Sequence, residues 1–206
     1  SNQIKDSLIL KALNSNFLEL NDSIKIKSNI PIMNINTDSI KITDIDSMLI
    51  PFNISLDKNL DIINFKINPL PNDNYKIKIN SGAITDFFGN SNEPIFINLK
   101  TKAYEDYGTL FLKTINNSNL PYFIEIINFK GEKIIKKLGN KIDGNYSFYN
   151  LIPDKYTVRI IIDENKNFEW DTGNYLKKIQ PEKVIYLASE LDLRANWELN
   201  ESIKIK

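Results

Sequence analysis

The sequence predicts an all-β protein made of two consecutive antiparallel β-sandwich domains. Short segments alternate apolar and polar side chains, and clusters of turn-forming residues separate these segments. The chain has 206 residues, which is enough for two domains of about 100 residues each. Short strands at regular spacing, with turns between them, are typical of sandwiches and barrels.

The alternation has the period of a half-buried strand. Isoleucine occupies every second position in these segments and lysine or another polar residue the positions between, so one face is apolar and the other faces water. The segments are residues 23–27, 39–43, 64–68, 75–79, 96–100 and 109–113. Turn clusters at 69–74 and 88–92 separate some of them. Residues 7–20 hold the only loose helical spacing, and Leu8 to Leu10 fits a strand equally well.

A domain boundary is expected near residues 101–106. One run of strands ends there, and a new run starts at Tyr107. The sequence therefore predicts domains at 1–103 and 104–206, each of a size that suits a sandwich.

Composition excludes several chemistries. The chain has no His and no Cys, so it has no Ser-His-Asp triad, no thiolate nucleophile, no imidazole or thiolate zinc site and no disulfide. Its 26 Lys and Arg balance 26 Asp and Glu, which argues against nucleic acid as a partner. No stretch reaches the roughly 18 to 20 apolar residues that cross a bilayer, so a transmembrane segment is not expected.

The end of the first half resembles a known domain. It runs from the strand at 75–79 through Gly82, Asp86, Gly89 and Asn90 to a last strand that ends at Thr101. This order resembles the closing part of the bacterial Ig-like domain of the S-layer type. The resemblance implies an Ig-like sandwich over residues 1–103.

A second motif lies in the other half. It consists of Gly144, Tyr146, Phe148, Leu151, Pro153, Tyr156, Val158 and Arg159. The spacing resembles the carboxypeptidase-regulatory, transthyretin-like (prealbumin-like) sandwich and the collagen-adhesin B-type repeat. Alternate motif residues point to one face, so they are expected to share one core. Asp154 stands where the family has Gly, and we expect it to adopt the left-handed conformation there.

The order of the two domains is similar to that of Ig-like surface lipoproteins of Gram-negative bacteria. That resemblance implies an exported, non-enzymatic protein of the outer membrane or cell surface, with the periplasm as second choice. It also implies a lipid anchor upstream of residue 1.

Residues 163–171 carry the most pointed chemistry in the sequence. Oxygen-bearing side chains at the first, third, fifth and ninth positions match the start of a calcium loop. The candidate ligands are the side chains of Asp163, Asn165, Asn167 and Asp171 and the backbone carbonyl of Glu169. Phe168 stands where such a loop has Gly, and Asn174 where it has a bidentate Glu. The alternative is a polar hairpin with no metal, and no other cofactor is expected.

Two further readings of the second half remain open. Asp163, Glu164, Glu169 and Asp171 could supply a carboxylate pair for glycoside hydrolysis, although one shared loop fits solvated or metal-facing groups better. The basic run of Lys130, Lys133, Lys136, Lys137 and Lys141 fits a strand with a wet face or an edge protected by lysine.

Aromatic side chains offer a possible sugar platform. The candidates are Tyr104, Tyr107, Tyr122, Phe123, Trp170, Tyr175, Tyr186 and Trp197. Trp170 and Tyr175 are the expected surface residues, whereas Trp197 is expected to be packed. The leading hypothesis is a non-catalytic envelope module that spaces or presents a protein-binding surface. Carbohydrate binding near Trp170 is the alternative, and an enzyme comes third.

Overall fold

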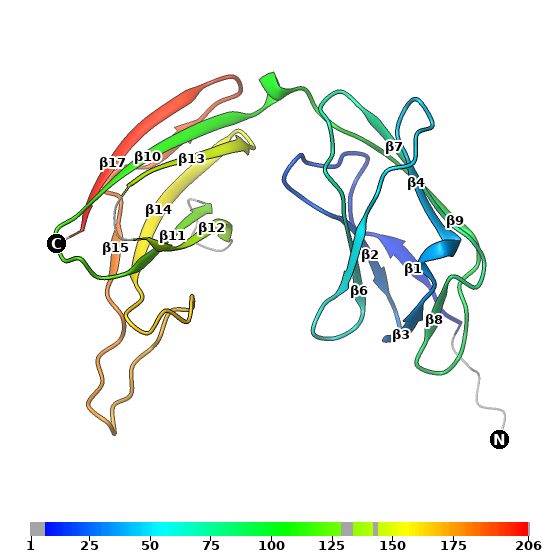
Figure 1. The fold of residues 1–206 in the computed structure, drawn as a ribbon, viewed down its shortest axis with the longest axis horizontal. Coiled ribbons are helices and arrows are strands. Elements are labelled where there is room, and N and C mark those ends of the chain that lie inside the picture. Colours follow the sequence, from blue (N-terminus) through cyan, green and yellow to red (C-terminus); the bar gives the residue numbers. More distant parts are fainter. Residues whose placement is uncertain (1–6, 129–133, 142–143, 206) are drawn as a thin grey trace. The chain divides into compact units, whose positions relative to one another are not determined.

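The computed structural model describes residues 7–128, 134–141 and 144–205 (Figure 1). The chain divides into two compact units, Ser1–Ala103 and Tyr104–Lys206. The described residues form strands and loops, with two short 3-10 turns, η1 (Thr37–Ser39) and η2 (Tyr104–Asp106). In these parts of the chain no helix has the length and apolarity needed to cross a bilayer.

The first unit is built from antiparallel strands (Figure 1). One sheet has the order β1-β2-β6-β5, a second has the order β4-β7-β9, and β3 pairs with β8. The strands are β1 (Leu10–Ala12), β2 (Ile24–Ser28), β3 (Ile32–Ile35), β4 (Ile40–Thr43), β5 (Asn53–Leu56), β6 (Ile62–Lys66), β7 (Asn74–Ile79), β8 (Ile84–Asp86) and β9 (Ile95–Lys100).

The core of this unit follows the alternation in the sequence. Ile24 and Ile26 of β2, with Ile77 and Ile79 of β7, are all buried in one cluster. Burying an isoleucine side chain contributes about 1.5–3 kcal/mol, so the alternating isoleucines decide which face of each strand turns inward. The predicted sandwich with its apolar faces inside is confirmed.

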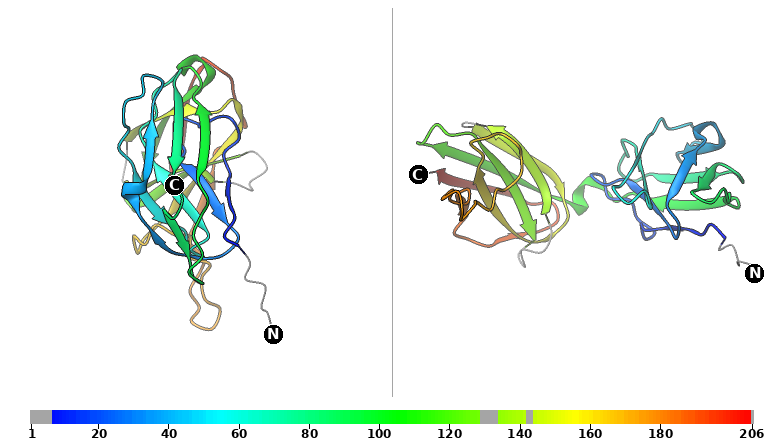
Figure 2. Two further views of the ribbon diagram at one scale, coloured as in Figure 1. Left: turned by 90° about the vertical axis from the view of Figure 1, so that its right-hand side faces the viewer. Right: turned by 90° about the horizontal axis from the view of Figure 1, so that it is seen from below.

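The second unit has two sheets, shown from two further directions in Figure 2. One has the order β13-β10-β17, and the other has the order β12-β11-β14-β15, with β16 also paired to β14. The strands are β10 (Gly108–Asn116), β11 (Tyr122–Asn128), β12 (Ile134–Lys141), β13 (Gly144–Leu151), β14 (Asp154–Ile162), β15 (Val184–Tyr186), β16 (Leu191–Leu193) and β17 (Glu198–Ile205).

One strand pair departs from the predicted antiparallel pattern. β10 and β17 run parallel, from Thr109 opposite Glu198 to Asn116 opposite Ile205. Strands at opposite ends of a domain can pair in parallel because the chain between them supplies the long crossover that this arrangement requires. Alternation alone marks a strand but does not give its direction.

The motif of the second unit forms one core, as predicted. Tyr146, Phe148, Leu151, Tyr156 and Val158 are all buried in the same cluster. The hydroxyl of Tyr146 lies 2.9 Å from that of Tyr122, so the polar end of this buried side chain is hydrogen-bonded.

Two expectations for single residues were wrong. The left-handed residue near the motif turn is Asn150, with φ of 55°, whereas Asp154 begins β14 as a strand residue. Asn tolerates this conformation well because its short side chain can hydrogen-bond locally. Trp197 is 50% exposed rather than packed, because it lies before β17 and not on that strand. Its ring contacts the Arg194 guanidinium, whose carbon lies 4.9 Å from the ring centroid.

The basic run lies partly on an edge strand. Lys136 and Lys137 belong to β12, which is at the edge of its sheet. Lys130 and Lys133 lie outside the described residues.

β11 is buried on both faces. Tyr122, Ile124 and Ile126 point into the core of the second unit, yet Phe123, Glu125 and Ile127 on the opposite face are also buried. Something must cover that second face, and the loop that follows β14 does so over Phe123.

Candidate functional site

Asp163 holds the start of the predicted calcium loop. It follows β14 directly, and its side chain is fully buried. Its carboxylate accepts hydrogen bonds from the backbone N–H groups of Asn167 and Phe168, both at 3.1 Å. A buried carboxylate is stable only when it is paired or hydrogen-bonded, so these contacts bind the loop to the residue that begins it.

The other predicted ligands are also joined by hydrogen bonds. The side-chain amides of Asn165 and Asn167 donate to one oxygen of Asp171, at 2.6 and 3.1 Å. Their side-chain oxygens accept from the backbone N–H groups of Asn167 and Glu169, at 3.0 and 2.8 Å. Each asparagine side-chain oxygen therefore accepts one hydrogen bond and keeps one lone pair.

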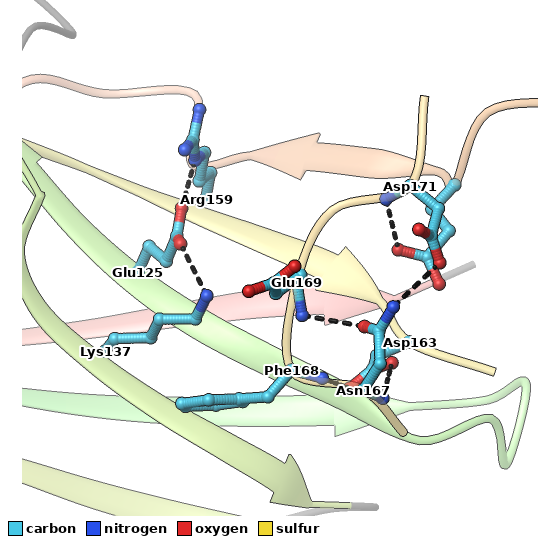
Figure 3. Close-up of polar contacts among 9 residues, drawn as sticks. Glu125, Lys137, Arg159, Asp163, Asn167, Phe168, Glu169 and Asp171 are labelled. Carbon is cyan, nitrogen blue, oxygen red and sulfur yellow. Dashed lines mark hydrogen bonds and ion pairs between the residues drawn. The ribbon is translucent and has the colours of Figure 1, made fainter. Parts of the chain in front are cut away.

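Glu169 takes a different place from the other predicted ligands. Its backbone N–H donates to the side-chain oxygen of Asn167, and its carboxylate points away from Asp171, so only its backbone carbonyl stays a candidate ligand (Figure 3). Within residues 7–128, 134–141 and 144–205, no three or more His, Cys, Asp or Glu side chains are grouped so that they could hold a metal ion. Calcium binding at this loop stays a prediction.

Glu182, on the chain that returns toward β15, also contacts the loop, and no motif in the sequence predicted this contact. One of its carboxylate oxygens accepts from the backbone N–H of Asp171 at 3.1 Å. Burial raises the pKa of Glu182, the N–H of Asp171 opposes that rise, and the negative charges of Asp171 and Asp163 add to it. The residue lies 11 positions beyond Asp171, so local motif spacing could not have found it.

Phe168 covers the outer face of β11. Its φ is 65°, a conformation that costs an aromatic residue roughly 1–2 kcal/mol. Its ring packs edge-to-face on Phe123 with 5.3 Å between centroids, and the ammonium of Lys137 lies 4.6 Å from its centroid. Gly139 leaves room for it, because a Cβ there would lie 1.9 Å from the ring.

A buried charge lies next to this ring (Figure 3). Glu125 is 2% exposed, and its carboxylate meets Nε of Arg159 at 2.5 Å and Nζ of Lys137 at 3.4 Å. Lys137 also lies 4.3 Å from the ring centroid of Phe123. The Glu125 carboxylate is paired with both cations, so the cluster is explained by ion pairing and does not support an acid–base role for Glu125.

The two predicted ligand-binding aromatics both lie on the segment between β14 and β15. Trp170 is 48% exposed, and its indole N–H donates to the carbonyl of Glu182 at 3.0 Å. Tyr175 is 95% exposed. Of the other candidates, Tyr107, Tyr122 and Phe123 are buried, while Tyr104, Tyr186 and Trp197 are exposed.

A pair of exposed phenylalanines was missing from the aromatic residues considered above. Phe87 and Phe88 are 69% and 63% exposed, with ring centroids 6.0 Å apart. They follow Asp86, which is buried and accepts from the backbone N–H groups of Phe88 and Asn90 and from the Asn90 side chain, each at 2.8 Å. Two consecutive aromatic residues inside a predicted turn could have indicated this exposed pair, because turns lie at the surface.

No protein-family model matches the sequence, and no curated protein does either. Among solved structures, the chain is similar to native alpha-2-macroglobulin from Escherichia coli spanning domains MG0-NIE-MG1. The identity is 10%, the match covers 87% of this chain and 71% of that one, and the TM-score is 0.42.

Two pilus proteins are also similar. The major pilin subunit BcpA of Bacillus cereus is 10% identical, over 97% of this chain and 70% of that one, with a TM-score of 0.31. The pilus 2b backbone protein of group B streptococcus is 11% identical, over 95% and 96%, with a TM-score of 0.27. These similarities are remote, and the sandwich assignment rests on the strand pairing and cores described above.

Replacing Gly139 by Ala tests whether the Phe168 ring needs the space that this glycine leaves. The added methyl group would overlap the ring, so the free energy of unfolding should fall by about 1–3 kcal/mol. Chemical denaturation of Gly139→Ala, Phe168→Ala and the double variant measures the coupling. In the Phe168→Ala background most of the cost should disappear. An equal cost in both backgrounds would contradict the proposed fit.

Calcium binding is expected to be weak, with a dissociation constant of about 10⁻⁴ to 10⁻³ M, because only Asp163 and Asp171 supply acidic side chains at ligand positions and Phe168 stands in place of the turn Gly. Calorimetric titration of the whole chain checks this. Asp171→Ala should abolish the heat, and Asp154→Ala, at an exposed carboxylate on β14, should not. Stabilisation should reach about 1.4 kcal/mol at ten times the dissociation constant. No heat and no change in melting temperature at millimolar calcium would leave the polar hairpin as the better account.

Proposed function

We propose that this chain is a non-catalytic module of an exported envelope protein and that it binds a protein partner through the turn at Phe87 and Phe88. The observation that carries the binding proposal is the exposure of both rings on a turn that is held in place by a buried carboxylate. The resemblance of the two halves to an Ig-like sandwich of the S-layer type and to a transthyretin-like sandwich, in that order, supports the envelope assignment. A lipid anchor upstream belongs to the same proposal.

Exposed aromatic rings favour a protein partner at this turn. Large aromatic side chains often carry most of the binding energy of an interface, and a rigid turn loses little conformational entropy on binding. Met33 lies on β3, the strand that pairs with β8 just before the turn, and it is 69% exposed. Residues 84–94 contain no Lys or Arg, so the turn itself brings no cations that would attract anionic polymers.

Carbohydrate binding near Trp170 and Tyr175 remains the alternative. Aromatic side chains can stack on sugar rings. Both residues lie on one segment, and Trp170 is 48% and Tyr175 95% exposed. A glycan ligand would lose affinity on Trp170→Ala but not on substitution of Phe87. That difference separates the two hypotheses.

Replacing Phe87 and Phe88 together by Ser tests the protein-binding turn. Both side chains are exposed, so the free energy of unfolding should change by less than about 0.5 kcal/mol. Affinity capture from the native envelope with the whole chain as bait, compared by quantitative mass spectrometry, should recover a partner. The double variant should lose at least about tenfold of that recovery, as expected for two hot-spot side chains.

The matched control is Phe96→Ser, at a phenylalanine that is 67% exposed on β9 of the same unit. Recovery by this variant should equal that of the unsubstituted chain. A partner that both variants retain equally would place the binding surface elsewhere.

Stability should respond to pH through Asp86. Burial raises the pKa of its carboxyl, but hydrogen bonds from Asn90 and neighbouring N–H groups outweigh burial and hold the pKa below the usual 3.8. A lowered pKa stabilises the folded state above 3.8, and this contribution is lost as the pH falls through the folded pKa. The difference in unfolding free energy between the unsubstituted chain and Asp86→Asn should therefore be largest near neutral pH and shrink in acid. A difference that does not depend on pH would contradict this role.

A further inference from the structure

The segment between β14 and β15 forms a hairpin with apolar side chains at its tip. Figure 1 shows it in orange, extending beyond the strands of its own unit. Tyr175 is 95% exposed and Leu176 is 92% exposed, the highest values among large apolar side chains in the parts of the chain that the structure describes. We call residues 172–181 the tip hairpin.

The tip hairpin is a defined turn. Asn174 and Ile179 exchange two backbone hydrogen bonds of 2.9 and 3.0 Å, and the N–H of Lys178 donates to the carbonyl of Tyr175 at 3.2 Å. Gly173 lets the two arms approach, because a Cβ there would lie 2.6 Å from the backbone nitrogen of Pro181. Gly173 also has a φ of 77°, which side chains rarely adopt.

The residue types at the tip are unusual for such a turn. Turns of this kind favour Gly, Asn, Asp and Ser, which suit the backbone and remain well hydrated. Tyr175 and Leu176 bury almost nothing in the fold, so they contribute little hydrophobic stabilisation to it. Their apolar surface is instead available to a second body.

Positive charge lies beside these two side chains. Lys177 and Lys178 complete the turn, and residues 172–181 include no Asp or Glu. Neither lysine takes part in an ion pair with a described residue. The tip hairpin therefore presents an apolar point with uncompensated cations next to it.

We propose that the tip hairpin docks on an anionic lipid bilayer. Tyr has an apolar ring and a polar hydroxyl, which suits the boundary between headgroups and acyl chains, and Leu176 would enter the acyl side of that boundary. Lys177 and Lys178 would meet lipid phosphates, and each should strengthen binding roughly fivefold. This surface differs from the Phe87–Phe88 turn, so the inference goes beyond the proposed protein binding.

The charge of the tip favours a lipid surface over a protein partner. Lys177 and Lys178 lie beside the two apolar side chains and suit lipid phosphates, whereas residues 84–94 have exposed aromatic rings without such cations. A bilayer accepts a small apolar insertion because flanking cations add electrostatic attraction. The contact should therefore be reversible and sensitive to salt.

Vesicle binding tests the proposal with the whole chain. Vesicles of phosphatidylcholine with about 30% phosphatidylglycerol should bind the chain, and pure phosphatidylcholine vesicles should bind it much less. Raising the salt from about 0.1 to about 0.5 M should weaken the binding. Tyr175→Ser combined with Leu176→Ser should lower the partition coefficient at least about tenfold. Lys177→Gln combined with Lys178→Asn should also lower it, and Asn suits the left-handed backbone at position 178, where φ is 54°.

A matched control lies in the first unit. Met48 and Leu49 are 65% and 66% exposed, so Met48→Ser combined with Leu49→Ser removes two large apolar side chains, as the tip variant does, and should leave vesicle binding unchanged. Because the chain has no Cys, a single Cys at position 176 or 49 can carry a polarity-sensitive dye. The dye at 176 should shift to shorter wavelength on anionic vesicles, and the dye at 49 should not.

The proposal is overturned if anionic vesicles bind the tip variant as well as they bind the unsubstituted chain, or if they bind neither. It is also overturned if the dye at 176 does not shift. Loss of a captured protein partner on Tyr175→Ser, without any vesicle binding, would assign the tip hairpin to a protein instead.

Discussion

Glu125 fixes the strand register of the sheet β12-β11-β14-β15 in the second unit. It lies directly opposite Lys137 on β12 and Arg159 on β14, so one carboxylate is flanked by a cation on each neighbouring strand. A shift of either pair by one residue would place Glu125 and its cation on opposite faces of the sheet. Because an unpaired buried charge is very costly, the sheet has one favourable register, and every loop that leaves it starts from a fixed point.

That register also determines where the segment after β14 begins. Glu125 and Phe123 share the outer face of β11, and Phe168 reaches that face only if Asp163 directs the chain across it. The strained backbone of Phe168 is stabilised by the ring contacts that it makes there. The hairpin with Trp170 and Tyr175 therefore grows from a rigid base.

The alternation in the sequence was sufficient to predict the sandwich, but not the strands that depart from the simple two-faced pattern. Ile24 and Ile77 turn inward because burial of an isoleucine outweighs any competing preference on a two-faced strand. β11 has no alternation in its burial, and on its outer face Phe123 is covered by Phe168 from a distant loop. The parallel pairing of β10 and β17 and the position of Glu182 also depend on contacts between remote segments, which no local pattern encodes. The candidate site was also predictable only in part. The sequence pattern indicated the loop residues from Asp163 to Asp171, but it did not indicate the residues that they pack against.

The two exposed surfaces share one construction. In each, a buried aspartate accepts backbone N–H groups at the start of a turn or loop, Asp86 before Phe87 and Asp163 before the hairpin that carries Tyr175. The anchor fixes the backbone, and therefore the exposed side chains beyond it need not pack to be held in position. Apolar residues at such positions increase the risk of aggregation and add little to folding. The binding proposals account for their presence, and the two segments differ in charge: residues 84–94 contain no Lys or Arg, whereas Lys177 and Lys178 follow Tyr175 and Leu176.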